Sequence, residues 1–345
     1  FESVSGLTGT GFSIFKNIKY LDPTLILWRS SSQWIGGLFF LLILIIIFSN
    51  KSFNYKMTNL TFSGDSNFKS EENIKDNILK IFIIYSVLSI IILTLLSFSG
   101  LRLFNSLNMS MTLISGGGFL PTDSIDKIIS TYLQKTIFIL SLLISMLNFY
   151  LLFNLFNKKI LIREHKEDLY LVAVSIVFFI LIYFNNYEGL DIVISVISSL
   201  ANSGLTLVKS DNNLSLYFLL LTIIGGSLIS NTSGIKLTRF YILLKITSLE
   251  IIKLISPNSV INKTIFSSDK KITEENVKIS FLIFISFFLS LFILSSLLVV
   301  DNIGFEKSFK LSILTLTNTV NSEMFDMGNI NFSNLLTSSK ISLIL

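Results

Sequence analysis

Four short polar stretches of the sequence contain residue types that can bind a cation. Each follows a segment of helical character, and together they are Thr8-Gly9-Thr10-Gly11-Phe12, Ser115-Gly116-Gly117-Gly118-Phe119, Ala201-Asn202-Ser203-Gly204-Leu205 and Thr317-Asn318-Thr319-Val320-Asn321. Their backbone carbonyls, hydroxyls and amides offer the neutral oxygens that replace the hydration shell of a hard monovalent cation. Because they hold no His and no carboxylate, they suit neither acid–base catalysis nor a transition metal. The stretches favour ion transport, and we expect no enzymatic activity and no covalently bound cofactor.

The composition places these stretches beside membrane spans. Hydrophobic residues make up 51% of the chain and charged residues only 14%, whereas a soluble domain carries about 25% charged residues. Mean hydropathy is +0.72. Apolar segments long enough to cross a hydrocarbon core of ~30 Å are Thr24–Phe48, Ile78–Phe98, Tyr132–Phe156, Leu169–Phe184, Leu214–Leu244 (interrupted) and Val277–Val300. Polar backbone within a membrane is tolerated only where it is buried in protein or lines a water-filled path, so four such stretches predict four sides of one pore.

The sequence excludes several other classes of site. It contains no Cys, which rules out disulfides, thiolate metal sites and cysteine nucleophiles within these residues. No signal peptide is recognisable, because no charged leader precedes an apolar region. The sequence opens without Met inside a polar motif and stops in an apolar run, so we expect a fragment that lacks membrane segments at both ends.

One structural unit recurs along the chain: an apolar span, a short helical segment, a polar stretch and a second span. The short segments Leu101–Ile114, Gly189–Leu200 and Phe305–Leu316 cannot span a membrane, so they are predicted to be re-entrant helices whose negative C-terminal dipole ends face the pore. The fold class is therefore an all-α polytopic membrane protein of four pseudo-symmetric, parallel repeats. The predicted division is a first repeat in 1–50, a cytoplasmic connector in 51–77, a second repeat in 78–158, a third with an interrupted inner helix in 159–247, a second connector in 248–276 and a fourth, truncated repeat in 277–345.

Charge predicts the orientation of the chain. The longer segments between spans carry a net positive charge, while the segments with the polar stretches carry a net negative charge. The positive-inside rule places the basic loops in the cytoplasm and the polar stretches toward the outer side. Two readings of the outer acids remain open, namely attraction of cations and a general bias of membrane topology.

Several sequence features resemble the TrkH/KtrB (Trk/Ktr/HKT) family of potassium transporters. The matching segments are residues 1–11, the start of the following span at Leu27-Trp28-Arg29-Ser30 and Gln33-Trp34-Ile35-Gly36-Gly37, Met111 through Phe119, Asn148-Phe149, Gly225-Gly226-Ser227 with Gly234-Ile235-Lys236 and Arg239, and Thr315-Leu316-Thr317-Asn318. The resemblance covers essentially the whole chain. It implies a pore subunit that brings potassium into the cytoplasm across the bacterial inner (plasma) membrane. It also implies a homodimer and a cytosolic nucleotide-binding regulatory subunit of the TrkA/KtrA type.

The same resemblance assigns the site residues. The selectivity filter would consist of Thr8, Gly9, Thr10 and Gly11, then Ser115, Gly116, Gly117 and Gly118, then Asn202, Ser203 and Gly204, and finally Asn318, Thr319 and Val320. An intramembrane gate loop would comprise Gly225, Gly226, Ser227, Ser230, Asn231, Thr232, Ser233, Gly234, Lys236 and Arg239.

The fourth stretch departs from the family pattern. Val320 stands where the family usually has glycine, and a β-branched residue resists positive φ, so its carbonyl is predicted to point differently. This leaves open a potassium transporter, a pore of relaxed potassium over sodium selectivity, and a non-conducting pore-like subunit. The gate loop also departs, because Leu228, Ile229 and Ser233 replace small residues, which predicts a stiffer or more hydrophobic gate.

Charged and glycine residues near the spans give further expectations. Arg29 is predicted to snorkel to the membrane interface. Glu2 either braces the first stretch from behind or is a solvated acid. Lys236 and Arg239 either lock the gate loop by binding helix C-terminal carbonyls or follow the positive-inside rule. Gly36-Gly37 is predicted to serve close helix packing rather than ion contact.

Overall fold

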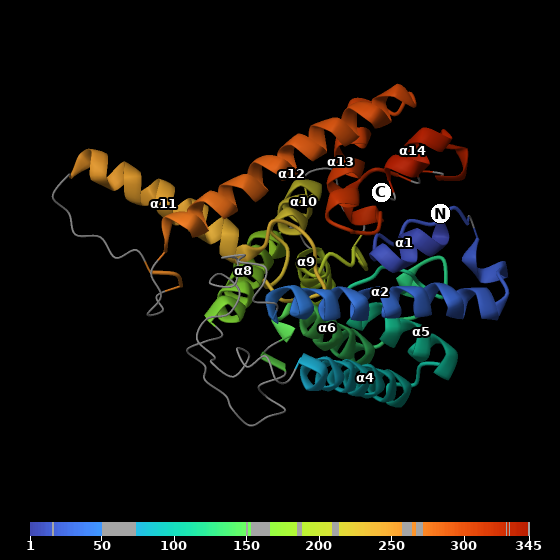
Figure 1. The fold of residues 1–345 in the computed structure, drawn as a ribbon. Coiled ribbons are helices and arrows are strands. Elements are labelled where there is room, and N and C mark those ends of the chain that lie inside the picture. The colour runs from blue at the N-terminus through green and yellow to red at the C-terminus, as the bar shows by residue number, and fades with distance from the viewer. Residues whose placement is uncertain are drawn as a thin grey trace.

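The computed structural model describes residues 1–15, 17–49, 74–149, 151–152, 166–184, 188–208, 214–256, 264–266, 272–328, 330 and 332–343. The regular secondary structure of these residues is helical throughout (Figure 1). The helices of the predicted spans are α2 (Pro23–Ser49), α4 (Ile74–Phe98), α6 (Tyr132–Met146), α8 (Lys166–Tyr183), α10 (Ser215–Ile224), α11 (Leu237–Ile255) and α12 (Glu274–Val300). They coincide with the predicted apolar segments because an apolar run in lipid satisfies its backbone polar groups only by coiling on itself.

Further helices precede, separate or follow those of the spans. They are α1 (Glu2–Thr8), α5 (Leu103–Ile114), α9 (Gly189–Leu200), α13 (Phe305–Leu316) and α14 (Thr337–Ser342), with 3₁₀ turns at Ile18–Tyr20, Ile125–Lys127, Glu323–Phe325 and Phe332–Asn334. The helices α9 and α13 have the bounds that the sequence predicted, and α5 begins two residues later than expected. Figure 1 shows α9 and α13 near the middle of the molecule and α1 and α5 toward its right-hand side.

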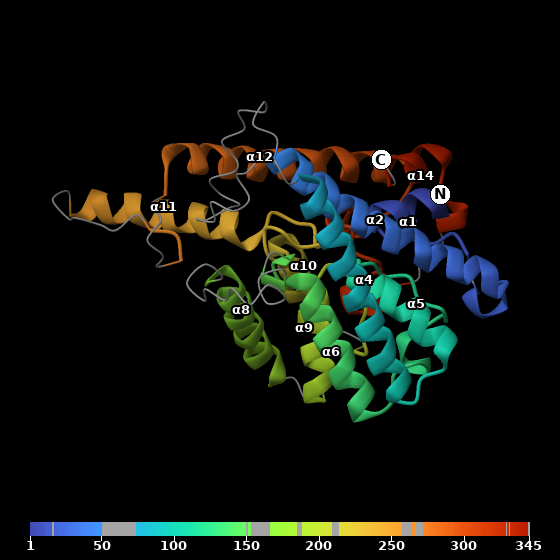
Figure 2. The same cartoon turned by 60° about the horizontal axis from the view of Figure 1, so that its bottom comes forward.

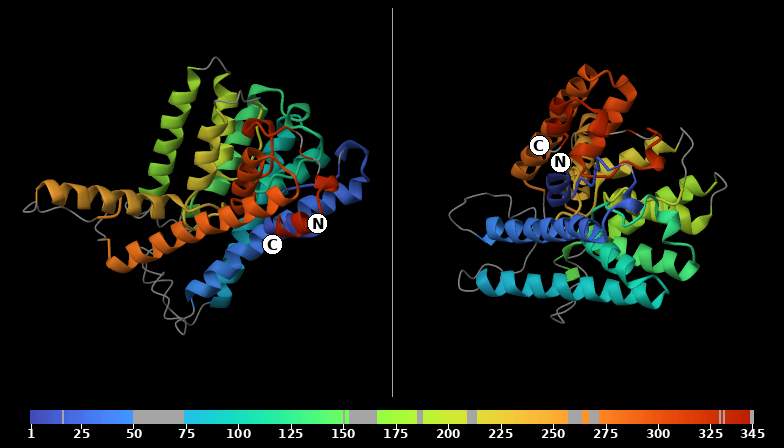
Figure 3. Two further views of the ribbon diagram at one scale, coloured as in Figure 1. Left: turned by 90° about the horizontal axis from the view of Figure 1, so that it is seen from above. Right: turned by 90° about the vertical axis from the view of Figure 1, so that its right-hand side faces the viewer.

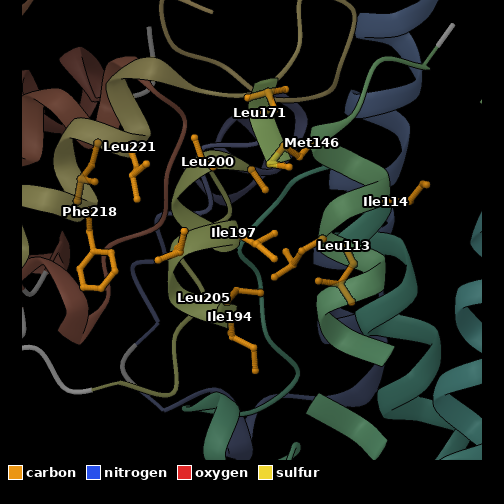
Figure 4. Close-up of a cluster of buried hydrophobic side chains, with 14 of the residues drawn as sticks. Leu113, Ile114, Met146, Leu171, Ile194, Ile197, Leu200, Leu205, Phe218 and Leu221 are labelled. Carbon is orange, nitrogen blue, oxygen red and sulfur yellow. The ribbon is translucent and has the colours of Figure 1, made fainter. Parts of the chain in front are cut away.

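The buried core surrounds α9. From Ile194 to Leu200 every side chain of this helix is buried. Figure 4 shows Ile194, Ile197 and Leu200 facing apolar side chains of the neighbouring helices, among them Leu113 of α5, Met146 of α6 and Leu221 of α10. Within a membrane such contacts stabilise the fold through van der Waals packing rather than through removal of apolar surface from water. The core thus fixes one short helix against α6, α8 and α10, and the polar stretch after α9 is held in place.

The outward surfaces of the long helices are apolar. On α12, Phe281, Leu282, Leu289 and Phe292 are all exposed. Soluble monomers rarely expose a contiguous apolar surface of this kind. Residues 78–98 and 274–300 form helices that are long and apolar enough to cross a membrane by length and composition. Figures 2 and 3 show α12 beside α11 and both extending past the rest of the bundle.

Helix interruptions occur at two places. The predicted break in Leu214–Leu244 lies between α10 and α11, from Gly225 to Lys236. A second break was not predicted: α6 ends at Met146 rather than continuing to Phe156, because Leu147 adopts an extended conformation (φ −72°, ψ 161°). The Met146 carbonyl then accepts a hydrogen bond from Ser227 N at 3.0 Å, and Phe149 N donates to the Ile229 carbonyl at 2.6 Å. The backbone bonds that α6 gives up are therefore used to hold the loop of the third repeat.

Other boundaries also differ from the sequence prediction. The helix α4 begins at Ile74, inside the predicted connector 51–77, and α11 continues to Ile255, inside the predicted connector 248–276. The remainder of the first connector, the segment 153–165 and parts of the second connector lie outside the described residues. The start of α2 is marked by Asp22, whose carboxylate accepts hydrogen bonds from the hydroxyl and amide of Thr24; these bonds lower the pKa of Asp22.

Candidate ion pathway

The four polar stretches share one backbone geometry. In each, the second residue has a positive φ: 80° at Gly9, 69° at Gly116, 57° at Asn202 and 48° at Asn318. Gly and Asn are the residues that adopt this left-handed conformation most readily, and it is a common way to end a helix. Gly stands at this position in the first two stretches and Asn in the last two for one structural reason. Each residue turns the chain sharply at the end of a short helix.

The stretches converge on one cavity. Its volume is about 250 Å³, room for several water molecules at about 30 Å³ each. It is lined by Leu7, Thr8, Gly9, Gly36, Gly37, Phe40, Ser115, Gly116, Asn202, Asn231, Ser233 and Asn318. All four repeats contribute, and each of α1, α5, α9 and α13 ends at or within two residues of a lining residue. Because a helix C-terminus carries a partial negative charge, four such ends make the cavity favourable for a cation.

Side chains join neighbouring stretches directly. Thr10 Oγ1 donates to Asn318 Oδ1 at 3.3 Å, which links the first stretch to the fourth. Asn202 Nδ2 donates to Thr319 Oγ1 at 3.3 Å, which links the third to the fourth. These residues come from different repeats, and their hydrogen bonds hold the stretches in a fixed relation to one another.

Val320 occupies the space that three glycines leave open. A Cβ atom built on Gly118 would lie 2.5 Å from both Cβ and Cγ1 of Val320, and one on Gly204 would lie 2.9 Å from Cγ1. A Cβ atom on Gly11 would lie 3.3 Å from Val320 Cβ. The four equivalent positions therefore have room for one side chain between them, and Val320 supplies it.

The fourth residues of the four stretches, Gly11, Gly118, Gly204 and Val320, adopt two backbone conformations. Gly11 and Gly204 have positive φ, at 73° and 70°, while neither Gly118 nor Val320 is among the residues with positive φ. Val320 thus stands in one of the two positions where a β-branched residue meets no backbone strain.

Arg29 does not snorkel to an interface, as the sequence had suggested. Its side chain is 1% exposed, and its Nε donates to Glu2 Oε2 at 2.9 Å. The guanidinium also lies 4.1 Å from the ring centroid of Phe119, at the end of the second stretch. The prediction was wrong because it treated Arg29 as an isolated charge, whereas an acid 27 residues earlier neutralises it.

Glu2 braces the first stretch from behind, which was one of its two predicted roles. Its Oε1 accepts hydrogen bonds from Ile14 N at 2.8 Å and from Ser13 Oγ at 2.7 Å. On the next turn of α2, Gln33 Oε1 accepts from Phe119 N at 3.2 Å. The helix α2 therefore holds the ends of the first two stretches through Arg29 and Gln33.

The Gly36-Gly37 pair permits close approach of backbones, as predicted. A Cβ atom on Gly36 would lie 2.1 Å from the Leu7 carbonyl oxygen, and one on Gly37 would lie 2.8 Å from Ser115 Cβ. Only glycine lets α2 pack this closely against α1 and the second stretch. Both residues also line the cavity.

The loop between α10 and α11 contacts three of the four repeats at the cavity. Ser233 N donates to Asn202 Oδ1 at 3.1 Å, and Asn318 Nδ2 donates to Ser233 Oγ at 3.0 Å. Asn231 Nδ2 donates to the carbonyl of Ile114, the last residue of α5, at 2.8 Å. In this structure the loop is docked against the ends of the polar stretches.

Lys236 stabilises the loop from within. Its side chain is buried, and Nζ donates to Ser230 Oγ at 3.2 Å, to Thr232 Oγ1 at 2.8 Å and to the Thr232 carbonyl. Lys236 therefore does lock the loop, though through the loop's own oxygens rather than through helix ends. Arg239 Nη1 lies 3.4 Å from the Ile235 carbonyl.

Glu167 at the start of α8 was not identified from the sequence. Its Oε1 accepts from Leu228 N at 3.2 Å and Thr238 Oγ1 at 2.5 Å, and its Oε2 accepts from Ser227 Oγ at 3.0 Å. One carboxylate thus holds both ends of the loop. The neighbouring Asp168 Oδ1 accepts from Asn148 N at 2.9 Å, where α6 is interrupted. The available signal was the pair of acids directly before an apolar span.

The chain is similar in sequence to several known cation transporters. No model of a protein family matches the chain. It is 27% identical over 308 residues to an uncharacterized cation transporter of Methanocaldococcus jannaschii, with 85% of this chain and 61% of the relative covered. It is 26% identical over 352 residues to the Trk system potassium uptake protein TrkG of Escherichia coli K12, with 95% and 70% covered. The resemblance to Trk-type transporters is confirmed.

The fold is also that of a Trk-type protein. The crystal structure of the potassium transporter TrkH from Vibrio parahaemolyticus superposes with a TM-score of 0.82 at 21% identity, covering 99% of this chain and 73% of that one. The predicted fold class is thereby confirmed. TrkH of Escherichia coli K12 is 24% identical over 286 residues. This chain matches 61% and 57% of the length of the Methanocaldococcus relative and of that TrkH.

Proposed function

We propose that this chain is the pore-forming part of a protein that takes potassium into the cell. The observation that carries the proposal is the convergence of four equivalent polar stretches on one cavity at the ends of four short helices. The relatives named as Trk potassium uptake proteins support the choice of ion. Potassium is the transported substrate, and the four negative helix ends favour its entry without any charged ligand.

The selectivity filter in this proposal consists of the four stretches. Backbone carbonyls of residues 8–11, 115–118, 202–204 and 318–320 replace the water around the ion. The hydrogen bonds from Thr10 to Asn318 and from Asn202 to Thr319 support this assignment, because they hold the stretches at a fixed spacing. The four repeats follow the division made from the sequence.

The loop from Gly225 to Lys236 acts as the gate. Its position at the cavity, in contact with Asn202, Asn318 and Ile114, supports this role. The docked loop lies in the path of an ion that leaves the cavity, so conduction requires the loop to move. Its internal bonds to Lys236 and its anchor on Glu167 set the free energy that this movement costs.

The surroundings of the pore follow from the charge pattern and the relatives. The chain is a multi-pass protein of the bacterial inner (plasma) membrane, with the filter stretches toward the outside and the basic connectors in the cytoplasm. Two copies form a homodimer, and a cytosolic nucleotide-binding subunit regulates the gate. We assign no enzymatic activity, since the relatives are named as transporters.

A weakly selective or non-conducting pore-like subunit is the second candidate function. The observation that favours it is the Val320 side chain, which lies against three filter glycines. An apolar group at a constriction excludes water and slows a hydrated ion. In this case the protein would pass sodium and potassium alike, or neither.

Growth at low potassium tests the proposed function. The full-length protein is expressed in a bacterial strain that lacks its own high-affinity potassium uptake, and growth is followed as potassium is lowered. We expect rescue at potassium concentrations where the empty vector fails. A protein that reaches the membrane and does not rescue, while a known Trk protein does, contradicts potassium uptake and favours the second candidate.

A further inference from the structure

The acceptor oxygens at the cavity are already occupied by donors of the loop. Asn202 is 2% exposed, and its side-chain oxygen Oδ1 receives the Ser233 amide at 3.1 Å. Its Nδ2 donates to the Thr222 carbonyl at 2.9 Å, and because a carbonyl only accepts, this bond settles which atom is the oxygen. The Asn202 oxygen is thus a fixed, neutral ligand at the cavity wall that a loop N–H now uses.

A second oxygen is occupied in the same way. The Ile114 carbonyl belongs to the last residue of α5, directly before the lining residues Ser115 and Gly116. It receives the side-chain amide of Asn231 at 2.8 Å. Carbonyls at a helix C-terminus have no partner within the helix, and they bind cations or N–H donors. Here the donor comes from the loop.

The loop also brings the Lys236 side chain close to the cavity. Lys236 Nζ is bound to Thr232, and both chain neighbours of Thr232, Asn231 and Ser233, line the cavity. When Nζ is protonated, its repulsion of a potassium ion in a buried site of low dielectric is stronger than in water. The docked loop therefore opposes an ion in the cavity by taking its ligands, and protonated Lys236 adds to this effect.

We propose that Asn202 Oδ1 and the Ile114 carbonyl form a monovalent-cation site that the loop closes with its own N–H donors, so that cation binding and loop docking exclude each other. The inference rests on the proposed function and adds to it that the transported ion itself favours gate opening. By linkage, a ligand that binds only the undocked state shifts the equilibrium toward that state.

Thiol labelling of the loop tests this exclusion. Ser230 is 1% exposed and lies inside the docked loop, and these 345 residues contain no Cys. A Ser230→Cys variant of the full-length protein, freed of any other reactive thiol, is reconstituted and treated with a water-soluble maleimide. Potassium is varied against N-methylglucamine at constant ionic strength. We expect saturating potassium to raise the labelling rate by roughly fivefold or more, the usual range of such couplings.

Two further variants distinguish competition between potassium and the loop from a general weakening of loop docking. Ser248→Cys on the exposed surface of α11 is the reagent control, and its labelling is expected not to depend on potassium. Asn202→Gly in the Ser230→Cys background keeps a residue suited to the positive φ while removing the oxygen. Competition predicts faster labelling without potassium and a reduced potassium effect. A purely structural role of Asn202 predicts faster labelling with the same potassium effect, which contradicts the proposal.

Uptake of ⁸⁶Rb⁺ by the same vesicles distinguishes failure of the proposed exclusion from failure of the proposed transport function. If rubidium enters and labelling is independent of potassium or slowed by it, the exclusion is wrong and potassium transport stands. If rubidium does not enter and potassium does not change labelling, both the exclusion and the proposed function are wrong.

Discussion

Glu2 and Arg29 form a buried ion pair that joins the helix before the first polar stretch to the long helix after it. The Nε–Oε2 distance is 2.9 Å, and the side chains are 8% and 1% exposed. The same carboxylate accepts the Ile14 amide, so the pair fixes the far end of the first stretch. Both charges are removed from water, and each is tolerated because the other neutralises it.

Replacing Glu2 by Gln leaves the Arg29 guanidinium buried without a counter-charge. Removal of one partner of a buried pair costs about 3–5 kcal/mol. We therefore expect a large drop in the thermal unfolding midpoint of the detergent-solubilised full-length protein. Glu306→Gln is the matched control, because Glu306 pairs with Lys310 at 2.7 Å while 78% exposed, and it is expected to leave the midpoint unchanged. Equal midpoints for the Glu2 variant and the wild type would contradict the pairing.

Val320 is predicted to limit ion flux by its size. Val320→Gly removes the side chain that fills the space beside Gly118 and Gly204, so we expect faster potassium flux and stronger preference for potassium over sodium. Val320→Thr keeps the branched shape and is expected to behave like the wild type. The measurement is potassium uptake by proteoliposomes with and without competing sodium. If the Thr variant conducts as fast as the Gly variant, polarity rather than size controls the flux.

The architecture and the positions of the four polar stretches at the ends of short helices could be predicted from the sequence because they depend on local patterns. Apolar length predicts a span, and the bounds of α9 and α13 follow from apolar segments that stop at polar residues. Asn202 and Asn318 stand where Gly9 and Gly116 stand because all four tolerate positive φ. Because all four stretches require a residue with positive φ, Gly or Asn recurs at this position in the sequence.

The supports of the site could not be predicted because they depend on pairs distant in sequence. Arg29 alone in an apolar span resembles a snorkelling charge, and only its contact with Glu2 shows that it is buried. Likewise Glu167 precedes Thr238 by 71 residues, and no local pattern connects them. The early end of α6 at Met146 is another such case, since the loop of a different repeat provides its hydrogen bonds.

Thr238 is predicted to hold the loop through Glu167. Thr238→Val keeps the shape and removes one hydrogen bond, worth about 1 kcal/mol, so the docked loop should open roughly fivefold more often. The labelling rate of Cys at position 230 in the Ser230→Cys background measures this opening. Thr247→Val on the same helix is the control, because the Thr247 hydroxyl bonds only to carbonyls of its own helix. Similar rates for both variants would show that Glu167 does not anchor the loop.

Gly36 is predicted to tolerate no side chain. Gly36→Ala would place a methyl group 2.1 Å from the Leu7 carbonyl oxygen, and overpacking of this kind costs about 1–3 kcal/mol. The unfolding midpoint of the solubilised protein should fall accordingly. Gly304→Ala has nothing within 4 Å of the new methyl group and should leave the midpoint unchanged. A Gly36→Ala protein as stable as the Gly304→Ala protein would contradict the close packing of α2 on α1.

Uptake of ⁸⁶Rb⁺ into proteoliposomes tests most directly whether the four stretches form a potassium path. The purified full-length protein is reconstituted with potassium inside the vesicles, and uptake is compared with that of empty vesicles and of the Val320→Gly variant. The account predicts rubidium uptake that external potassium suppresses, with a larger rate for the variant. Vesicles that contain folded protein and accumulate no more rubidium than empty vesicles, with either the wild type or the variant, would contradict it.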